Sequence, residues 1–363
     1  MARKNRRKLI HAAVTTQNII SIILLSLIAI VTLSFSIAIL LRNAALRKEN
    51  EAYKAQLEYI QEEGYYTVSE ADEMVNDAYE GGYESAKQEV LESVKQQLES
   101  GTGITTTVRS MFPDQILISK DGRYYFVPID KTLSLNSFTD TDFAKNTSGI
   151  LEYTGSDAAV LGTLGIDVSK FQGEIDWEKV ADSGVEYAFI RVGNRGTSTG
   201  KIVEDDYFIS NIEGALSAGI EVGVYFFSSA INEDEALEEA KFVLDAIEPY
   251  EVTYPVVIDI ERPDSSDYRT QNVSQEQMTD IARTFCDTVK GSGYTPMIYG
   301  NNESFALMLD MSKIEDIDKW IAFYSVPLYF PYEFSVWQYS ASGRIDGING
   351  EVDLNICVQK GWQ

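Results

Sequence analysis

The sequence predicts an α/β fold over about its last 200 residues: an irregular, TIM-like barrel of about five βα units followed by three strands. The first observation is a series of short apolar segments, the earlier ones separated by amphipathic stretches such as residues 207–218 and 235–247. The second is a glycine after several predicted helices, which is typical of the loop between a helix and the next strand. The predicted strands are residues 164–168, 187–192, 222–228, 254–261, 296–299, 319–324, 334–339 and 351–356.

A basic tail and an apolar segment precede this barrel. Residues 1–17 contain five basic residues and no acid: Arg3, Lys4, Arg6, Arg7 and Lys8. Residues 19–41 carry no charge and would extend about 34 Å as a helix, enough for a bilayer core of about 30 Å. A cleaved signal peptide has a shorter apolar region of about 7–15 residues. We therefore predict a single-pass membrane protein with a transmembrane helix over residues 18–41, a cytoplasmic tail over 1–17 and an extracellular remainder.

Residues 42–101 are rich in Glu, Lys, Gln and Ala, which predicts a helical stalk. A weak heptad stripe runs along it at spacings of four and three. Two interpretations remain open, namely a coiled coil that forms a homodimer and a solvated helical spacer. The stripe consists of Leu46, Asn50, Tyr53, Leu57, Ile60 and Gly64.

Residues 102–160 are predicted to form a small β element and a linker. The apolar runs 116–118 and 124–127 flank an Asp121-Gly122 turn, which is typical of a β-hairpin. A stretch rich in Ser, Thr, Asp and Asn follows. No chemistry is evident in this region, and the barrel is assigned to residues 161–363.

Composition restricts the chemistry of the barrel. The chain has 30 basic and 56 acidic residues and a net charge of −26, so it should not bind nucleic acid non-specifically. Its one histidine, His11, lies in the basic tail, which excludes a Ser-His-Asp triad or a histidine zinc site in the barrel. No cofactor or metal is predicted. The sequence leaves open whether the two cysteines, Cys286 and Cys357, form a disulfide.

The most informative segment is the predicted strand 254–261, which ends in Asp259 and Glu261. Side chains alternate along a strand, so these two acids point the same way, about 7 Å apart along the backbone. Two carboxylates on an otherwise apolar strand are costly to bury without a function. Paired carboxylates can cleave a glycosidic bond, because one protonates the leaving oxygen and the other stabilises the cationic transition state. We therefore predict that Asp259 and Glu261 are catalytic.

Further candidates fall at the ends of other predicted strands. The carboxyl ends of the strands form one rim of such a barrel, where active sites lie. Acids and aromatic side chains around that rim suit a sugar polymer, because aromatic faces stack on sugar rings. The predicted substrate-binding residues are Asp167, Asp353, Tyr225, Tyr299, Tyr324, Trp337 and Gln338.

Taken together, these motifs resemble the family 25 glycoside hydrolases, the lysozymes of the β/α-barrel type. The resemblance covers residues 164–357, a little over half of the chain, and the order of the motifs makes it specific. The motifs are Gly165-Ile166-Asp167-Val168-Ser169, Phe171-Gln172-Gly173, Ile175-Asp176-Trp177, Gly223-Val224-Tyr225-Phe226-Phe227, Asp259-Ile260-Glu261, Val336-Trp337-Gln338-Tyr339-Ser340, Gly347-Ile348-Asn349-Gly350 and Val352-Asp353-Leu354-Asn355.

The resemblance implies cleavage of the β-1,4 bond between N-acetylmuramic acid and N-acetylglucosamine in peptidoglycan. It implies that Glu261 is the general acid and that Asp259 orients the substrate acetamido group or stabilises a developing cation. It also implies that Asp167 and Asp353 bind substrate and tune charge. One departure is Phe226, where many members have a histidine, so a polar contact at the rim would be missing here.

Three alternatives remain open from the sequence. The barrel could bind peptidoglycan without cleaving it, or the chain could be a bitopic structural component of an envelope-spanning machine. A chitinase-like barrel is a third, although such enzymes carry an Asp-x-Asp-x-Glu run and this chain has Val257 at its first position. The preferred peptidoglycan chemistry and the role in growth, division or envelope assembly also remain open.

Overall fold

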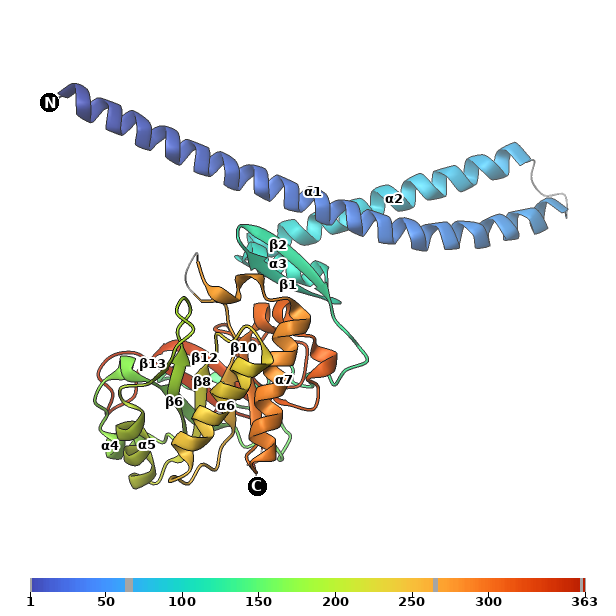
Figure 1. Cartoon of the computed structure of the whole chain (residues 1–363). Coiled ribbons are helices and arrows are strands. Elements are labelled where there is room, and N and C mark those ends of the chain that lie inside the picture. Colours follow the sequence, from blue (N-terminus) through green and yellow to red (C-terminus); the bar gives the residue numbers. More distant parts are fainter. Residues whose placement is uncertain (1, 63–67, 264–266, 360–361, 363) are drawn as a thin grey trace. The chain divides into compact units, whose positions relative to one another are not determined.

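The structure, a computed structural model, describes residues 2–62, 68–263, 267–359 and 362. It divides into two compact units, Met1–Pro113 and Asp114–Gln363 (Figure 1).

The first unit consists of three helices: α1 (Ala2–Glu62), α2 (Val68–Glu99) and α3 (Ile104–Met111). Helix α2 runs back along the C-terminal half of α1 (Figure 1). The Tyr79 hydroxyl donates to Asn43 Oδ1 at 2.9 Å. Where α2 passes Gly82, the missing side chain leaves room for Leu46 of α1. The two long helices therefore form a hairpin within one chain.

Half of the predicted heptad stripe faces this intrachain partner. Leu46, Asn50 and Tyr53 line a groove together with residues of α2. The side chains of Leu57 and Ile60, and Gly64 as a whole, lie outside the described residues. Because the described part of the stripe is used within the chain, a coiled-coil homodimer remains a prediction.

The apolar part of α1 changes its surroundings along its length. The segment Asn18–Gln56 is long and apolar enough to cross a membrane, with a mean hydropathy of 2.8 in its most apolar window. From Ile19 to Ile28, the large apolar side chains are exposed. From Ile30 onward, one face of α1 packs against α2 and α3, and Ser34 is only 3% exposed.

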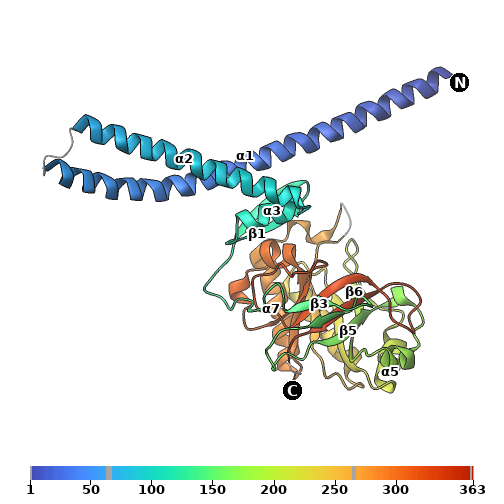
Figure 2. The same ribbon diagram turned by 180° about the vertical axis from the view of Figure 1, so that it is seen from behind.

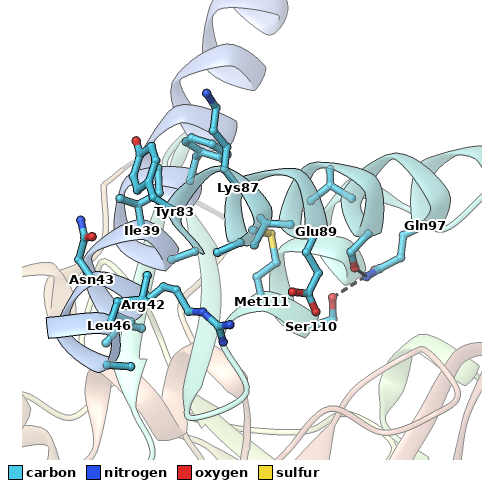
Figure 3. A pocket seen from close by; sticks show the side chains of 18 residues that line it. Ile39, Arg42, Asn43, Leu46, Tyr83, Lys87, Glu89, Gln97, Ser110 and Met111 are labelled. Carbon is cyan, nitrogen blue, oxygen red and sulfur yellow. Dashed lines mark hydrogen bonds between the residues drawn. The ribbon is translucent and has the colours of Figure 1, made fainter. Parts of the chain in front are cut away.

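A groove of about 600 Å³ lies beside this contact (Figure 3). It is lined by residues 35–46 of α1, by α2 and by the C-terminal end of α3. The Ser110 hydroxyl donates to Gln97 Oε1 at 3.1 Å across its edge, which joins α3 to α2 (Figure 3).

The second unit contains a closed barrel of eight strands, all at the predicted positions. Neighbouring strands are parallel except the last, which is antiparallel to both of its partners. Pairing of the first two strands closes the sheet (Figure 2). A ninth strand, β7 (Ile202–Glu204), extends β6 outside the ring. The barrel strands are β5 (Thr163–Val168), β6 (Tyr187–Arg195), β8 (Glu221–Phe227), β9 (Val256–Asp259), β10 (Pro296–Asn301), β11 (Asp318–Ala322), β12 (Val336–Gly343) and β13 (Val352–Cys357).

Among the described residues, four connections carry an α-helix, and a side chain caps the start of three of these helices. For example, the side chains of Asn232 and Ser274 accept hydrogen bonds from the first turns of α6 and α7. The connection after β10 has a short π turn (Ser304–Met308) and a 3₁₀ turn (Met311–Lys313) instead. The predicted count of about five βα units is thus met only in part. The helices are α4 (Trp177–Asp182), α5 (Phe208–Ser217), α6 (Glu233–Ile247) and α7 (Gln275–Gly291), with 3₁₀ turns at Lys170–Gln172 and Arg269–Asn272.

Aromatic rings fill the interior of the barrel below its mouth. The rings of Phe189 and Trp320 stack with centroids 4.4 Å apart, and those of Tyr187 and Tyr254 at 4.5 Å. Gly165 has no Cβ because one there would overlap the Tyr187 ring. This floor is closely packed, so the acids above it are held at the rim.

The segment before the barrel folds with it in the same compact unit. Strands β1 (Gln115–Lys120) and β2 (Arg123–Pro128) pair through the Asp121-Gly122 turn, where the sequence predicts a hairpin. A second pair, β3 (Phe143–Lys145) and β4 (Leu151–Tyr153), lies where the sequence predicts a linker. The linker interpretation was therefore wrong for these residues. The cysteines Cys286 and Cys357 are both free and buried.

Candidate active site

Four carboxyl groups meet at the mouth of the barrel. Asp167 lies near the end of β5, and Asp353 pairs with it from the start of the antiparallel strand β13. Asp259 is the last residue of β9, and Glu261 follows two residues later. Strand ends thus bring together acids that are up to 186 positions apart in the chain, the distance between Asp167 and Asp353. All four were predicted site residues.

Asp167 and Asp353 form a hydrogen-bonded pair. Burial raises the pKa of Asp167 to about 6, against the effect of its hydrogen bonds. Its Oδ2 accepts from Gln338 Nε2 and from Asn355 Nδ2, both at 2.8 Å. Burial and the charge of Asp167 raise the pKa of Asp353 to about 8. At neutral pH Asp353 therefore keeps its proton and donates it to the Asp167 carboxylate.

Asp259 lies opposite this pair. It is the most deeply buried of the four acids, with 4% of its surface exposed. Its pKa is raised well above the usual value by burial and by the charges of Glu261 and Asp167, while Arg191 opposes the shift. Among the described residues, its buried Oδ1 has no hydrogen-bond partner. An unpaired buried oxygen is costly, so this atom is suited to accept a hydrogen bond from a bound molecule.

Glu261 lies just beyond the end of β9 and is partly buried. Burial, and then the charge of Asp167, raise the pKa of Glu261 to about 7. A carboxyl group with this pKa is half protonated near neutral pH, as a general acid must be to donate a proton.

Gln338 connects two tyrosines to the acids. Its Oε1 accepts from the hydroxyls of Tyr299 at 2.9 Å and Tyr324 at 2.8 Å, while its Nε2 donates to Asp167. Tyr324 is 55% exposed and is accessible to a ligand. Tyr225 lies on the same inner face, with its ring edge-on to Trp320 at 6.1 Å. The structure thus brings these three tyrosines and Gln338 to the mouth, as predicted from their strand positions.

Trp337 does not join the site, so its prediction as a substrate-binding residue was wrong. It is fully buried, its Nε1 donates to Phe323 O at 2.7 Å, and its ring packs against Phe143 of β3 at 5.4 Å. Adjacent strand residues point to opposite faces, so Gln338 and Trp337 cannot both face the mouth. Phe226 likewise faces outward and packs against Phe242 of α6, so it removes no polar contact from the rim.

Sequence reasoning missed Arg191 and Asn355. Arg191 Nε and Nη2 both lie 2.6 Å from Asp205 Oδ2, and its guanidinium lies 5.0 Å from the ring centre of Phe171. Phe171 is 77% exposed. Residues two apart on a strand point to the same face, and Arg191 follows Phe189 by two positions, as Asn355 follows Asp353. This spacing could have identified both residues from the sequence.

The chain matches the family model described as Glycosyl hydrolases family 25 over residues 166–348. It is 29% identical over 192 residues to the autolytic lysozyme of Clostridium acetobutylicum, a match that covers 53% of this chain and 54% of that protein. It is 32% identical over 223 residues to lysozyme M1 of Streptomyces globisporus, covering 56% and 70% respectively. The chain thus spans about half the length of the first relative and more of the second.

A solved structure supports the fold. The modular autolysin LytC from Streptococcus pneumoniae, in complex with a synthetic peptidoglycan ligand, superposes with a TM-score of 0.50 at 24% identity. The match covers 66% of this chain and 57% of that chain.

The acid cluster predicts a pH-dependent cost in stability. The pKa of Asp353 is about 8 in the folded chain and near 3.8 when unfolded, so the folded state binds more protons between these values. Stability should therefore fall as pH rises from about 4 to about 8. Asp353→Asn removes this cost and should be more stable than the wild type by about 1–3 kcal/mol at pH 8, with a smaller difference at pH 4.5.

Chemical denaturation at both pH values measures this difference. Glu251→Gln, at an exposed acid of the same unit, is the matched control and should give the same small difference at both. A stability gain for Asp353→Asn that does not grow with pH would contradict the assignment.

Proposed function

Because the chain belongs to glycosyl hydrolase family 25, we propose that its barrel is a lysozyme that cleaves the β-1,4 bond between N-acetylmuramic acid and N-acetylglucosamine in peptidoglycan. The observation that carries this proposal is the cluster of four acids at the barrel mouth, in which the pKa of Glu261 is about 7. The relatives named lysozymes support the same substrate class.

In this proposal Glu261 is the general acid. It protonates the glycosidic oxygen as the bond to the anomeric carbon breaks. Asp167, held by two amide donors, supplies a negative charge that favours the developing cation, and Asp353 holds the shared proton. Tyr225, Tyr299, Tyr324 and Gln338 bind the sugars.

We further propose that the substrate assists its own cleavage. Asp259 and Glu261 come from one strand end, so neither easily reaches the opposite face of the sugar as a nucleophile. The 2-acetamido carbonyl oxygen can attack the anomeric carbon instead, while its N–H donates to the unpaired Asp259 Oδ1. Water then opens the oxazolinium-like intermediate, with Glu261 as the base. This sequence retains the anomeric configuration.

A catalytically inactive, peptidoglycan-binding barrel is the alternative, as is a bitopic structural component of an envelope-spanning machine. A barrel that only binds has no need to keep four acids together against their mutual repulsion. The intact cluster therefore favours the enzyme.

We also propose the domain order expected from the sequence: a cytoplasmic tail (1–17), a membrane anchor (18–41), a helical stalk (42–101), a region with a small β element (102–160) and an irregular TIM-like barrel (161–363) outside the cell. The exposed apolar start of α1 and its basic flank support the anchor. The helix is compatible with a signal anchor, and an extracellular barrel suits a cell-wall substrate.

Full insertion of residues 18–41 is incompatible with the packing of α2 and α3 on α1. The contact begins at Ile30, the middle of the proposed anchor, and α2 carries the exposed charges Glu92 and Lys95 beside it. A charged side chain at the bilayer centre costs at least about 2.5–3.5 kcal/mol. Helices α2 and α3 must therefore leave this part of α1 when the whole segment is in lipid.

The anchor predicts where a membrane-impermeant maleimide reacts. In intact cells Ser36→Cys should stay unlabelled until detergent is added, whereas Glu51→Cys should be labelled from outside. The native cysteines are buried and give little background. Labelling of Ser36→Cys in intact cells would show that the anchor ends before residue 36, which would be compatible with α2 and α3 staying packed there.

The Glu261→Gln variant should lose turnover and still bind peptidoglycan. Glutamine keeps the size of the side chain but cannot deliver a proton, and general acid catalysis contributes about 10²–10⁴-fold. Release of reducing ends from purified peptidoglycan measures turnover, and co-sedimentation measures binding. Glu251→Gln is the control and should match the wild type. Activity of Glu261→Gln within threefold of wild type would exclude Glu261 as the acid.

The stereochemical outcome tests substrate assistance. Proton NMR of the first-formed product should show the β anomer, and glycans lacking the N-acetyl group on the cleaved sugar should be very poor substrates. An α product would refute retention. Efficient cleavage of de-N-acetylated glycan would refute the role of the acetamido group.

A further inference from the structure

The β1–β2 hairpin, to which the sequence assigned no chemistry, contacts the barrel next to Glu261. Its turn residue Asp121 accepts a hydrogen bond from Arg262 Nη1 at 2.7 Å. Arg262 is the residue directly after Glu261. The contact joins positions 141 residues apart within the same compact unit.

Arg262 is held from two sides. Besides Asp121, its Nε lies 3.3 Å from Glu303 Oε1, and the same oxygen lies 2.8 Å from Lys120 Nζ of the hairpin. Glu303 is fixed at the end of β10, because its backbone N–H donates to Asn301 Oδ1 at 2.8 Å. Asp121 of the hairpin and Glu303 of the barrel thus contact the guanidinium, while Lys120 of the hairpin pairs with Glu303.

The hairpin itself is firmly docked on the barrel. The Tyr329 hydroxyl donates to Gln115 O at 2.7 Å and accepts from Leu117 N at 3.0 Å. Ile116 and Ile118 are 1% and 4% exposed and belong to the main core. Asp121 is therefore presented to Arg262 by a rigid element.

Among its described residues, the segment that carries Glu261 has few other anchors. Strand β9 ends at Asp259, and among the described residues up to Pro263 the last backbone hydrogen bond runs from Ile260 N to Tyr299 O at 3.0 Å. In the part of the chain that the structure describes, the side chain of Arg262 provides the next attachment along the chain.

We propose that Asp121 is a positioning residue of the active site, which holds the Arg262 guanidinium and thereby fixes the backbone that carries Glu261. The β1–β2 hairpin is then a working part of the hydrolase rather than a spacer. This inference rests on the proposed function, in which Glu261 is the general acid.

The size of the effect follows from exposure and geometry. Asp121 is 64% exposed, and exposed ion pairs contribute little to stability. Catalysis is more sensitive, because misplacing a reacting group by about 1 Å can cost about 10²-fold in rate. Loss of the contact should therefore lower kcat by about three- to tenfold and leave KM and the melting temperature almost unchanged.

Asp121→Asn in the full chain is the direct test. Asp121 has a left-handed backbone with φ of +50°, which asparagine tolerates, so the turn is kept while the charge is lost. Asp114→Asn is the matched control, because it breaks an exposed 2.6 Å ion pair with Lys131 at the base of the same hairpin. The kcat and KM are measured on soluble, uncross-linked peptidoglycan strands.

A double-mutant cycle separates positioning from a general structural effect. If Asp121 acts through Arg262, then Asp121→Asn should cause no further loss of kcat in an Arg262→Gln background. An undiminished loss in that background, a change in KM alone, or a kcat within twofold of wild type would each overturn the proposal.

Hydrogen exchange gives a readout that does not depend on activity. The amide of Ile260, which donates to Tyr299 O beside Glu261, should exchange faster in Asp121→Asn than in the wild type, while in Asp114→Asn its exchange should not change. Unchanged exchange would overturn the positioning role. If the wild type releases no reducing ends from any peptidoglycan, the proposed function fails, and the exchange experiment still decides whether the hairpin holds this segment.

Discussion

The structure depends on one electrostatic constraint, the crowding of four carboxyl groups into the mouth of a barrel whose floor is packed with aromatic rings. Four carboxyl groups packed together in a low dielectric cannot all be ionised at neutral pH, because their negative charges repel one another. The barrel meets the constraint by placing one proton between Asp353 and Asp167 and by raising the pKa of Glu261 to about 7. Two amide donors, from Gln338 and Asn355, stabilise the charge that remains on Asp167. The repulsion that costs stability is thus the source of a carboxyl group able to donate a proton near neutral pH.

The packed interior of the barrel holds the acids together despite the repulsion between them. Stacked rings fill the barrel from below, and small residues such as Gly165 and Gly223 leave room for them. The acids stand on that floor at strand ends, where backbone pairing fixes each Cα, as it does for Asp353 opposite Asp167. Glu261 is the exception because it lies beyond its strand, and the attachment of Arg262 to the hairpin and to Glu303 is therefore more important than its exposure suggests.

Much of this arrangement could be predicted from local sequence. Short apolar runs and glycines after helices predicted all eight barrel strands, and strand ends predicted which acids would meet. Local sequence could not assign Trp337, because both faces of β12 are buried and the choice of inner face depends on the whole barrel. Nor could it pair Arg191 with Asp205, or Arg262 with Asp121, because those contacts join separate elements. A heptad stripe likewise does not reveal whether its partner is a second chain or, as for Leu46, helix α2 of the same chain.

We propose that this acid cluster cuts peptidoglycan on one defined side of the disaccharide. Borohydride reduction of a complete digest, followed by mass spectrometry, identifies the sugar at each new reducing end. N-acetylmuramitol is expected at those ends in a wild-type digest. New ends that carry N-acetylglucosaminitol, or a digest without new ends from any peptidoglycan tested, would contradict it.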